Sequence, residues 1–387
     1  MISKKNLTNY WFTIEPYVYI CITDNCILLY NTLDGVFIES DKIKVIELLR
    51  EIVQEENCGV VLLTNEQFKQ KEINDFIREL RGKYMGDVID VDLSKGKPVQ
   101  LLPFFNLSGD IRALCKKHNF ASGKKILEFL SEISIYVDHS TNITNLIPFL
   151  QSLPGNLTIN VVGNLENVVD YVELLSFLDQ LPSSKNLICP CTNVISLQPT
   201  FENNFSYSVL VHFPVDMLQL GHSRQLLLNQ TLPIEYVFEV SSLDDCQQAK
   251  QLVEQFGIEK YQLKPIYTGD NIDFFEENVF LTKEDILSTS MSIEDFFANQ
   301  AMNIYDFWKV NVMPNGDIYA NVNHLALGNI CTHSIHEIIY KEVEEGKSWL
   351  RIRNQAPCST CIYQWFCPPP SDYEIIIGRL DLCHVKQ

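Results

Sequence analysis

Cys358-Ser-Thr-Cys361-Ile-Tyr-Gln-Trp-Phe-Cys367-Pro-Pro-Pro, with Cys383 further on, is the stretch around which this chain is organised. Two thiols separated by two residues can chelate one centre, and a third thiol shortly after them can close the same loop over it. Cys383 is the nearest candidate for a fourth ligand. The spacing therefore predicts a tetrathiolate site, for a [4Fe–4S] cluster or for zinc, at Cys358, Cys361, Cys367 and Cys383. The alternative is four unrelated buried thiols, because free cysteine often packs as a small apolar residue.

The composition indicates a globular chain with an acidic balance. Its 387 residues are 46% hydrophobic and 11% aromatic, which is enough for real cores, and a chain of this length usually forms about two or three domains. Thirty basic and forty-nine acidic side chains give a net charge of −19. This charge repels a nucleic-acid backbone, and no local basic stripe offsets it. We therefore expect no nucleic-acid partner.

The sequence carries no evident export or membrane signal. Lys4 and Lys5 are not followed by an apolar segment or a small-residue cleavage site, and no apolar run approaches the roughly 20 residues of a membrane span. Twelve cysteines in such a chain indicate reduced thiols, and clustered reduced thiols commonly serve metal or redox chemistry. We expect a cytoplasmic protein without disulfides and without a membrane partner.

The N-terminal part predicts a small antiparallel sheet followed by helices. Strands are expected over 17–22, 26–30 and 36–38, and helices over 41–54 and 65–81, with Thr64 as the N-cap of the second helix. This is the outline of a winged helix. The segment 26–38 resembles the PqqD-like leader-recognition domain of ribosomal-peptide maturation systems. The alternative is another small α+β domain.

From about residue 98 onward, short apolar runs alternate with helical patterns. Strands that alternate with helices indicate parallel βα units, either in an incomplete (β/α) barrel or in an open doubly wound sheet. We favour the incomplete barrel, an α/β fold with its functional groups at the carboxyl ends of the strands. The runs assigned to strands are 99–105, 133–137, 157–162, 187–189, 207–213, 235–240 and 261–266.

The last section contains a hairpin over 313–319, a turn over 327–330 and the cysteine run. Together they resemble a SPASM domain, the auxiliary iron–sulfur module of radical-SAM peptide maturases. The resemblance implies one [4Fe–4S] cluster, with zinc as the alternative, held by the four cysteines named above. It also implies that a second cluster is missing. Ala320 and Asn321 stand where the family has one thiol, Ser371 replaces another, and only Cys331 lies near a third position.

The whole chain is most similar to pseudo-radical-SAM proteins of double-glycine-leader peptide maturation systems. The expected domains are a PqqD-like domain over 1–94, a degenerate radical-SAM-type partial barrel over 95–305, and a SPASM-like metal-binding domain over 306–387. A radical-SAM enzyme needs three cysteines spaced Cys-x3-Cys-x2-Cys after its first barrel strand. The chain has no such triplet, and only Cys115 follows the expected first strand. The radical chemistry is therefore expected to be absent, with no S-adenosylmethionine (SAM) bound and no catalytic residue.

The resemblance then implies a peptide-binding scaffold or accessory subunit. Its expected partners are a precursor or leader peptide and an active radical-SAM maturase. The alternative is an iron–sulfur enzyme that acts on a peptide through its remaining auxiliary cluster, or through a different chemistry around Asp138 and His139 at the end of an expected strand.

Three further groups are weaker candidates for metal, acid–base or redox chemistry. A solvated turn, surface histidines and buried strand-end thiols are the respective alternatives, and we favour these. The groups are Asp138 with His139 and Ser140, Cys331 with His333 and His336, and Cys189 with Cys191.

Overall fold

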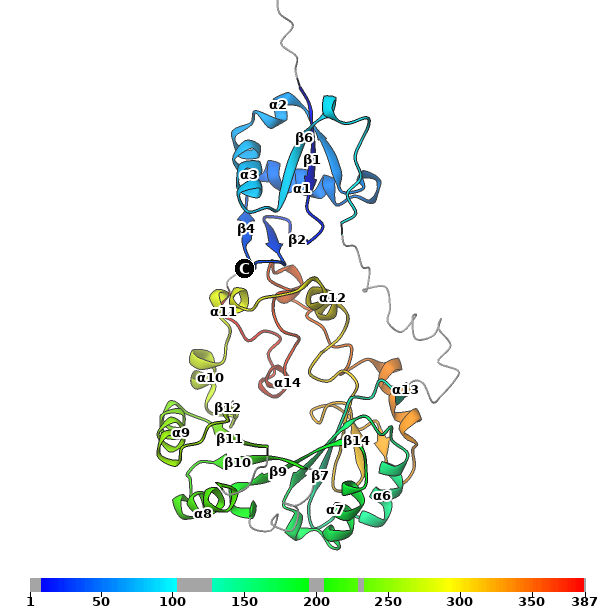
Figure 1. The fold of residues 1–387 in the computed structure, drawn as a ribbon, viewed down its shortest axis with the longest axis vertical. Coiled ribbons are helices and arrows are strands. Elements are labelled where there is room, and N and C mark those ends of the chain that lie inside the picture. The colour runs from blue at the N-terminus through cyan, green and yellow to red at the C-terminus, as the bar shows by residue number, and fades with distance from the viewer. Residues whose placement is uncertain (1–7, 103–126, 195–204, 229–232, 386–387) are drawn as a thin grey trace, which may run out of the picture.

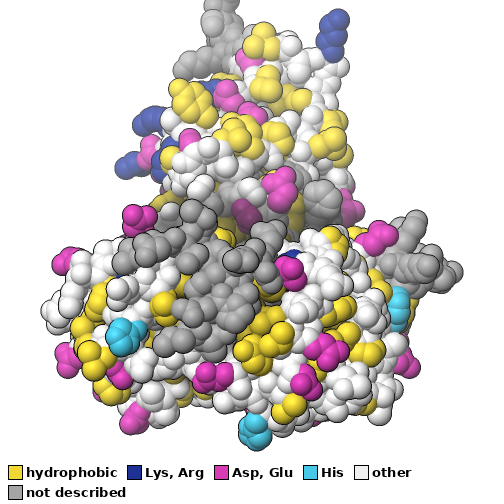
Figure 2. Space-filling view, turned by 60° about the horizontal axis from the view of Figure 1, so that its bottom comes forward, with side chains coloured by type: hydrophobic (Ala, Val, Ile, Leu, Met, Phe, Trp, Pro, Cys, Tyr) yellow, Lys and Arg dark blue, Asp and Glu magenta, His cyan; other side chains and the backbone are white. Residues whose placement is uncertain are grey.

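The computed structural model describes residues 8–102, 127–194, 205–228 and 233–385. An N-terminal domain stands on helices α11 and α12 and on the C-terminal segment of a larger α/β unit (Figure 1). Cys115 and residues 103–105 of the expected first barrel strand lie outside the described residues. On the face seen in Figure 2, Lys and Arg side chains gather mainly on the N-terminal domain, whereas the α/β unit shows acidic and apolar side chains.

The N-terminal domain contains two three-stranded antiparallel sheets, of which the sequence predicted one. The predicted sheet has the order β2-β3-β4, and the second has the order β5-β1-β6. Strands β1 and β6 were not predicted. The strands are β1 (Tyr10–Ile14), β2 (Val18–Ile22), β3 (Ile27–Asn31), β4 (Phe37–Ser40), β5 (Val60–Leu63) and β6 (Gly86–Asp90).

Three helices complete this domain: α1 (Ile43–Ile52), α2 (Asn65–Phe68) and α3 (Lys71–Gly82). The single helix predicted over 65–81 is wrong, because Gln70 adopts an extended conformation and separates α2 from α3. Thr64 is the predicted N-cap, and its hydroxyl accepts a hydrogen bond from the backbone N–H of Gln67 at 3.2 Å. Helices α1 and α3 bury their apolar faces against the two sheets.

A mixed sheet of nine strands forms the α/β unit, in the order β12-β11-β10-β9-β8-β7-β13-β14-β15. Its first six strands are parallel and follow one another in sequence order, as expected for βα units that wind in one direction. They are β7 (Glu132–Val137), β8 (Thr158–Gly163), β9 (Ser184–Pro190), β10 (Ser206–His212), β11 (Ile234–Val240) and β12 (Tyr261–Pro265).

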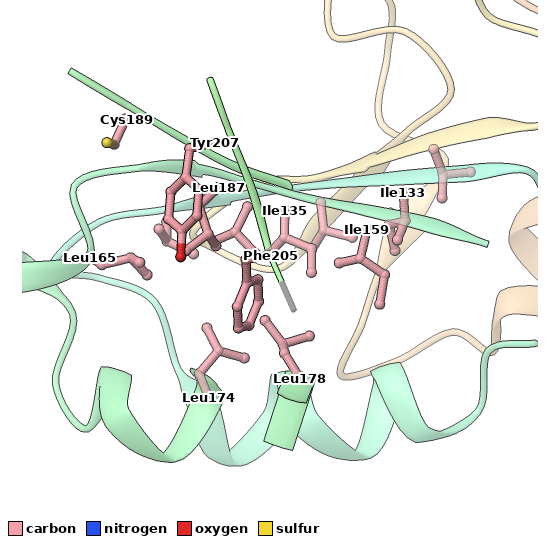
Figure 3. Packing of buried hydrophobic residues seen from close by; sticks show 14 of the residues in the cluster. Ile133, Ile135, Ile159, Leu165, Leu174, Leu178, Leu187, Cys189, Phe205 and Tyr207 are labelled. Carbon is pink, nitrogen blue, oxygen red and sulfur yellow. The ribbon is translucent and has the colours of Figure 1, made fainter. Parts of the chain in front are cut away.

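The sheet is open, because within the described chain β12 pairs only with β11 and β15 only with β14. Helices α6 (Ile143–Gln151), α7 (Tyr171–Asp179), α8 (Met217–Leu228) and α9 (Leu243–Phe256) follow its outer side (Figure 1). Alternate strand residues such as Ile133, Ile159 and Leu187 point toward Leu174 and Leu178 of α7 and form the main core (Figure 3).

The edge beside β7 is occupied by a strand from late in the sequence. Strand β13 (Lys309–Val312) pairs with β7 in parallel, with Val310 opposite Ile133. Sequence analysis placed a first strand over 99–105, but residues 99–102 form no strand. Val310 and Val312 are each 1% exposed and extend the apolar layer behind the sheet, so β13 stabilises this edge by burial.

The predicted hairpin around Asn315-Gly316 joins β13 to β14 (Asp317–Tyr319), and β15 (Gly328–Asn329) follows. The strands of the proposed C-terminal domain, 306–387, thus continue the sheet of the segment before it. The remaining helices are α10 (Ile272–Asn278), α11 (Lys283–Ser288), α12 (Ile293–Ala301), α13 (Ile335–Glu345) and α14 (Asp372–Ile377). No helix in the described ranges is long and apolar enough to cross a membrane.

Candidate functional site

The four cysteines named from the sequence line one cavity of about 240 Å³. Cys358 and Cys367 are buried, and Cys361 and Cys383 are half-buried. Within the part of the chain that the structure describes, no three Cys, His, Asp or Glu side chains are arranged to hold a single metal ion. The fold therefore gathers the four thiols at one cavity without placing three of them around one point. Their assignment as metal ligands stays a prediction.

Backbone hydrogen bonds place each of these cysteines. Cys358 begins a short 3-10 helix, and the N–H of Cys361 donates to the carbonyl of Cys358 at 3.0 Å. The N–H of Tyr363 then donates to the Cys361 Sγ at 3.4 Å. Cys383 forms a parallel bridge with Leu281, which brings the end of the chain back to the cavity. An N–H directed at a sulfur stabilises a thiolate more than a neutral thiol.

The cavity contains one buried cation. The Arg353 guanidinium forms an ion pair with Glu374 at 2.6 Å, with side chains 8% and 3% exposed, and it lies 3.9 Å from the Cys358 Sγ. Burial raises the pKa of the Cys358 thiol and raises that of Cys367 to about 12, while the Arg353 charge acts in the opposite direction on both. A metal cation would favour the thiolates far more strongly than one guanidinium does. Sequence analysis did not identify Arg353, because nothing in its local pattern distinguishes it from a surface arginine.

The N-terminal domain packs against the cysteine run. Alternate residues of β2 point to opposite faces of its sheet. Val18, Ile20 and Ile22 pack against the core of the N-terminal domain. Tyr19 and Cys21 face the other way, into a second cluster that also contains side chains from α11, α12 and the cysteine run. The β2-β3-β4 sheet is therefore buried on both faces, and one face forms the contact between the two parts of the molecule.

Aromatic ring contacts, a hydrogen bond and an ion pair stabilise this contact. The Tyr19 ring stacks on Phe296 of α12, with centroids 3.9 Å apart and planes 3° from parallel. Phe366, next to Cys367, lies edge-on to Phe296 at 4.8 Å. Glu39 of β4 accepts a hydrogen bond from the Tyr363 hydroxyl at 2.7 Å and pairs with Lys283 at 2.7 Å.

An apolar groove runs along the outer edge of β2. Its volume is about 530 Å³, and it lies between β2, the end of α1 and the segment 100–102. The N–H of Gln100 donates to the carbonyl of Cys58 at 3.0 Å and holds this segment against the domain. Only glycine fits at Gly59, because a Cβ there would lie 2.2 Å from the Gln100 carbonyl oxygen. The residues that line the groove are Val18, Tyr19, Ile20, Ile22, Ile52, Val53, Gln54, Glu55, Cys58, Gly59, Gln100, Leu101 and Leu102.

The outer edge of β2 lies along this groove, and among the described residues no strand pairs with its backbone groups. The N–H of Thr23 donates to the carbonyl of Cys26, and the N–H of Thr32 donates to that of Tyr17. Odd-numbered residues of β2 therefore bond to β3, and even-numbered residues direct their amides away from it, because antiparallel pairs alternate in this way. The main-chain groups of Ile20 and Ile22 point outward, and no other described strand pairs with this edge.

The face of the large sheet opposite its helices is half-buried and carries several polar side chains. Asn160 of β8 donates to Glu132 of β7 at 2.8 Å, and Asn186 of β9 donates to Ser208 of β10 at 3.1 Å. In β7 and β9 buried residues, which are mostly apolar, alternate with half-buried residues that include Glu132, Ser134 and Asn186 but also Ile188. In the incomplete barrel that the sequence predicted this face would be the interior, whereas the structure shows an open mixed sheet of nine strands.

A hydrogen-bonded network occupies the region of the missing second set of thiols. The Asn321 amide donates to both carboxylate oxygens of Asp306 at 3.0 Å and to Asp372 at 2.5 Å. Arg351 lies 3.7 Å from Asp306 and donates to the Ser371 carbonyl at 3.2 Å. Burial raises the pKa of Asp306 to about 6. Cys331 is exposed, and its sulfur accepts a hydrogen bond from Asn145 at 3.3 Å.

The weaker candidates lie in ordinary structural settings. Ser140 donates to the Asp138 carboxylate at 2.7 Å from its N–H, which closes a turn at the end of β7, and the adjacent His139 is exposed. Thr332 lies 2.8 Å from the His333 ring, and no metal-holding group joins His333 and His336 to Cys331 in the described ranges. Cys189 and Cys191 are 3% and 7% exposed and belong to the main core, as the favoured interpretation predicted.

Comparison with known proteins gives structural neighbours alone. No protein-family model and no curated protein matches the chain. The chain is similar to three crystal structures of SuiB from Streptococcus suis, each 11% identical in sequence. The SuiB structure bound to S-adenosylmethionine has a TM-score of 0.42, with 96% of this chain and 100% of SuiB covered. The structure bound to the precursor peptide SuiA has a TM-score of 0.41, with 97% and 99% covered, and a further SuiB structure has 0.41, with 96% and 100% covered.

Proposed function

We propose that this chain is a peptide-binding scaffold or accessory subunit in the maturation of a ribosomally made peptide. In this proposal the N-terminal domain takes up a leader peptide as an added strand along β2. The observation that carries the proposal is an edge of β2 with which no described strand pairs, beside an apolar groove of about 530 Å³. Strand addition draws its affinity from main-chain hydrogen bonds and its specificity from pockets for alternate side chains.

The edge of β2 can supply main-chain hydrogen bonds, and the groove can supply pockets for alternate side chains. The outward amides of Ile20 and Ile22 can pair with an extended peptide. Every second side chain of that peptide would then enter the groove between β2 and α1, where Ile52, Val53 and Leu101 offer apolar contact. The expected ligand is therefore an extended segment with apolar residues at alternate positions. Its precursor would be modified by a separate radical-SAM maturase, because this chain has no Cys-x3-Cys-x2-Cys triplet.

The proposal assigns one [4Fe–4S] cluster to Cys358, Cys361, Cys367 and Cys383, with zinc as the alternative. Four thiols that share one cavity are a suitable donor set for either group. A mononuclear zinc site needs every sulfur at about 2.3 Å from one point. In a cluster each thiolate binds a different iron, so the sulfurs lie farther apart than in a mononuclear zinc site. Four protein ligands leave no open position, so the group would stabilise the fold and not act on a substrate.

The polar face of the large sheet is the proposed location for the core peptide or for a surface of the maturase. Its half-buried asparagine, serine and glutamate side chains offer both donors and acceptors. A SAM-cleavage assay tests the opposite possibility, an enzyme that performs radical chemistry itself. Formation of 5′-deoxyadenosine by the purified, metal-loaded chain would contradict the scaffold proposal.

The groove is tested by binding of a fluorescently labelled leader-like peptide, an extended segment with apolar residues at alternate positions. Val53 lines the groove and is 39% exposed, so Val53→Arg places a charge in it with little effect on folding. We expect at least about tenfold weaker binding. The matched control is Ile43→Arg at the other end of α1, where the side chain is 71% exposed. Absence of binding by the unmodified chain at tens of micromolar protein, or equal affinities for Val53→Arg and Ile43→Arg, would contradict the proposal.

A further inference from the structure

We propose that filling of the cysteine cavity and binding of a peptide in the β2 groove are thermodynamically coupled through Tyr19. The inference rests on the proposed function, because it concerns the same groove and the same cavity. It predicts that metal loading changes the affinity for peptide, and that peptide changes the retention of metal by the same factor.

Tyr19 contributes to both sites. It lines the groove along the edge of β2. Its ring also stacks on Phe296 in the cluster beside the cysteines, and its hydroxyl accepts a hydrogen bond from the Gln300 amide at 2.9 Å. The Tyr19 side chain is 9% exposed, so its position is determined by these packing partners. A change in the position of α12 would therefore reach the groove directly.

The other end of this contact reaches the cysteine run. Phe366 packs edge-on against Phe296 at 4.8 Å and against Tyr30 at 5.3 Å, and it directly precedes Cys367. The Asn299 amide, also on α12, donates to the carbonyl of Cys367 at 3.3 Å and to that of Trp365 at 3.0 Å. Helix α12 is thus bonded to the backbone of a cavity cysteine and stacked on a groove residue.

A second connection runs along β2 itself. Cys21 follows Tyr19 on the same face of the strand, and it packs in the same cluster as Cys361 and Cys367. Two residues of the cavity wall, Cys361 and Cys367, therefore pack in the same cluster as the face of the β2-β3-β4 sheet. Main-chain movements of the cysteine run must be accommodated by this sheet, because packed interiors transmit displacement.

The coupling is expected to be positive, because metal binding orders the segment that holds Phe366 and, through Phe296, Tyr19. Thiolate ligation restrains the backbone from Cys358 to Cys367 together with Cys383, a region that has only a short 3-10 helix of its own before α14. A restrained cysteine run holds Phe366 and Phe296 in place, and these hold Tyr19. A peptide that binds to an edge that is already ordered loses less conformational entropy. We expect metal loading to tighten peptide binding about 5- to 20-fold, within the usual range for coupled sites.

The experiment compares one full-length protein in two states. One sample is loaded with metal, either zinc or iron and sulfide under anaerobic conditions, and the other is treated with a chelator and kept reduced. The dissociation constant for labelled leader peptide is measured in both by fluorescence anisotropy. In parallel, metal release to a chromogenic chelator is measured with and without saturating peptide. We expect tighter peptide binding in the loaded state and slower metal release with peptide.

Two variants interrupt the proposed connection. Phe296 lines neither the groove nor the cavity, and Phe296→Leu removes its ring stack on Tyr19. Gln300→Ala removes only the hydrogen bond to the Tyr19 hydroxyl. We expect Phe296→Leu to bind peptide as the metal-free protein does, whether loaded or not, and Gln300→Ala to lose part of the difference. The matched control is Phe68→Leu, which removes a ring pair with Tyr10 inside the N-terminal domain and should keep the full metal dependence.

The outcomes separate the two proposals. Peptide binding in neither state would overturn the proposed function and, with it, the coupling. Peptide binding of equal strength in both states would overturn the coupling and leave the scaffold function intact. Full metal dependence in both Phe296→Leu and Gln300→Ala would also overturn the role of Tyr19.

Discussion

The cysteine cavity and the Asn321 network both hold segments near the C-terminus that have little regular secondary structure, but they do so with different chemical groups. In the network, the Asn321 amide donates to the carboxylates of Asp306 and Asp372. The Arg351 guanidinium lies 3.7 Å from Asp306 and donates to the Ser371 carbonyl, while its buried Nε has no hydrogen-bond partner in the described part of the chain. In the cavity, the closest hydrogen-bond acceptor of the Cys358 thiol is a carbonyl at 3.8 Å. Polar side chains that bond to one another need no further ligand, whereas four clustered thiols gain little from one another until a metal is bound.

Arg353 and Glu374 bring charged side chains, which are characteristic of the network, to the cysteine cavity. They combine a guanidinium and a carboxylate, as the network does, but they form a buried, directly bonded ion pair whose Arg353 lines the cysteine cavity. The comparison therefore predicts that the cavity depends on metal and on this pair, and that the network depends on neither. The following predictions test this difference, from the largest expected effect to the smallest.

The largest effect is expected for Cys358→Ser. Loss of one of four ligands should remove the metal and lower the free energy of unfolding by at least about 5 kcal/mol, because ligation free energy at a structural site is folding free energy. Metal and sulfide analysis and denaturant unfolding, both under anaerobic conditions, measure this. The control is Cys331→Ser, since Cys331 is exposed and bonded to Asn145. Full metal content in Cys358→Ser, or a wild-type protein without metal, would show that the cavity is a thiol-lined core.

Arg353→Met should have the next largest effect. It leaves Glu374, which is 5% exposed, without its charge partner, and breaking a buried pair in this way costs roughly 3–5 kcal/mol. Urea unfolding checks the value. Arg379→Met is the matched control, because its pair with Glu276 has side chains 40% and 47% exposed and should contribute less than about 1 kcal/mol. Equal losses in the two variants would contradict a special role for the buried pair.

Asn321→Ala should cost about 1–3 kcal/mol, because it leaves Asp306 and Asp372 without their shared donor. Metal content should stay unchanged, which distinguishes the network from the cavity. Asn278→Ala, on an exposed position of α10, is the control and should be close to neutral. Loss of metal in Asn321→Ala would show that the two regions are one unit.

The smallest effect is a pH dependence that belongs to the network alone. Burial raises the pKa of Asp306 from 3.8 to about 6, so between these values the folded state binds more protons than the unfolded state. The contribution of Asp306 to stability is therefore fully present below about pH 4 and is lost as the pH rises through 6. Asp306→Asn should remove this slope. Unfolding curves of both proteins between pH 4 and 7 would contradict the assignment if their slopes were the same.

The sequence predicted best those features that depend on local pattern. Strands β2, β3 and β4 and the cap at Thr64 follow from alternation and turn chemistry over a few residues. The cysteine spacing predicted a metal site at four thiols that line one cavity, and their role as ligands stays a prediction. The single helix over 65–81 was wrong because the helical period continues through Gln70, and an apolar period does not register one extended residue.

Features that depend on partners distant in the sequence were not predictable. Val310 pairs with Ile133, which is far away in the sequence. The apolar run at 99–105 has a similar strand pattern, so the sequence alone did not show which of the two segments pairs with β7. The ion pair between Arg353 and Glu374 was not predictable for the same reason, because nothing in the local sequence shows that the fold buries both side chains.

The sequence by itself thus determined which residues are apolar, which alternate and which thiols are close along the chain. Only the tertiary structure decided what covers each apolar face. The alternation of β2 predicts two faces, but it does not say that Tyr19 and Cys21 pack against Phe296 and the cysteine run while Ile20 packs into its own domain. The physical reason is that local periodicity encodes the need for burial, and the partner that satisfies this need is selected by packing between segments that meet only in the folded chain.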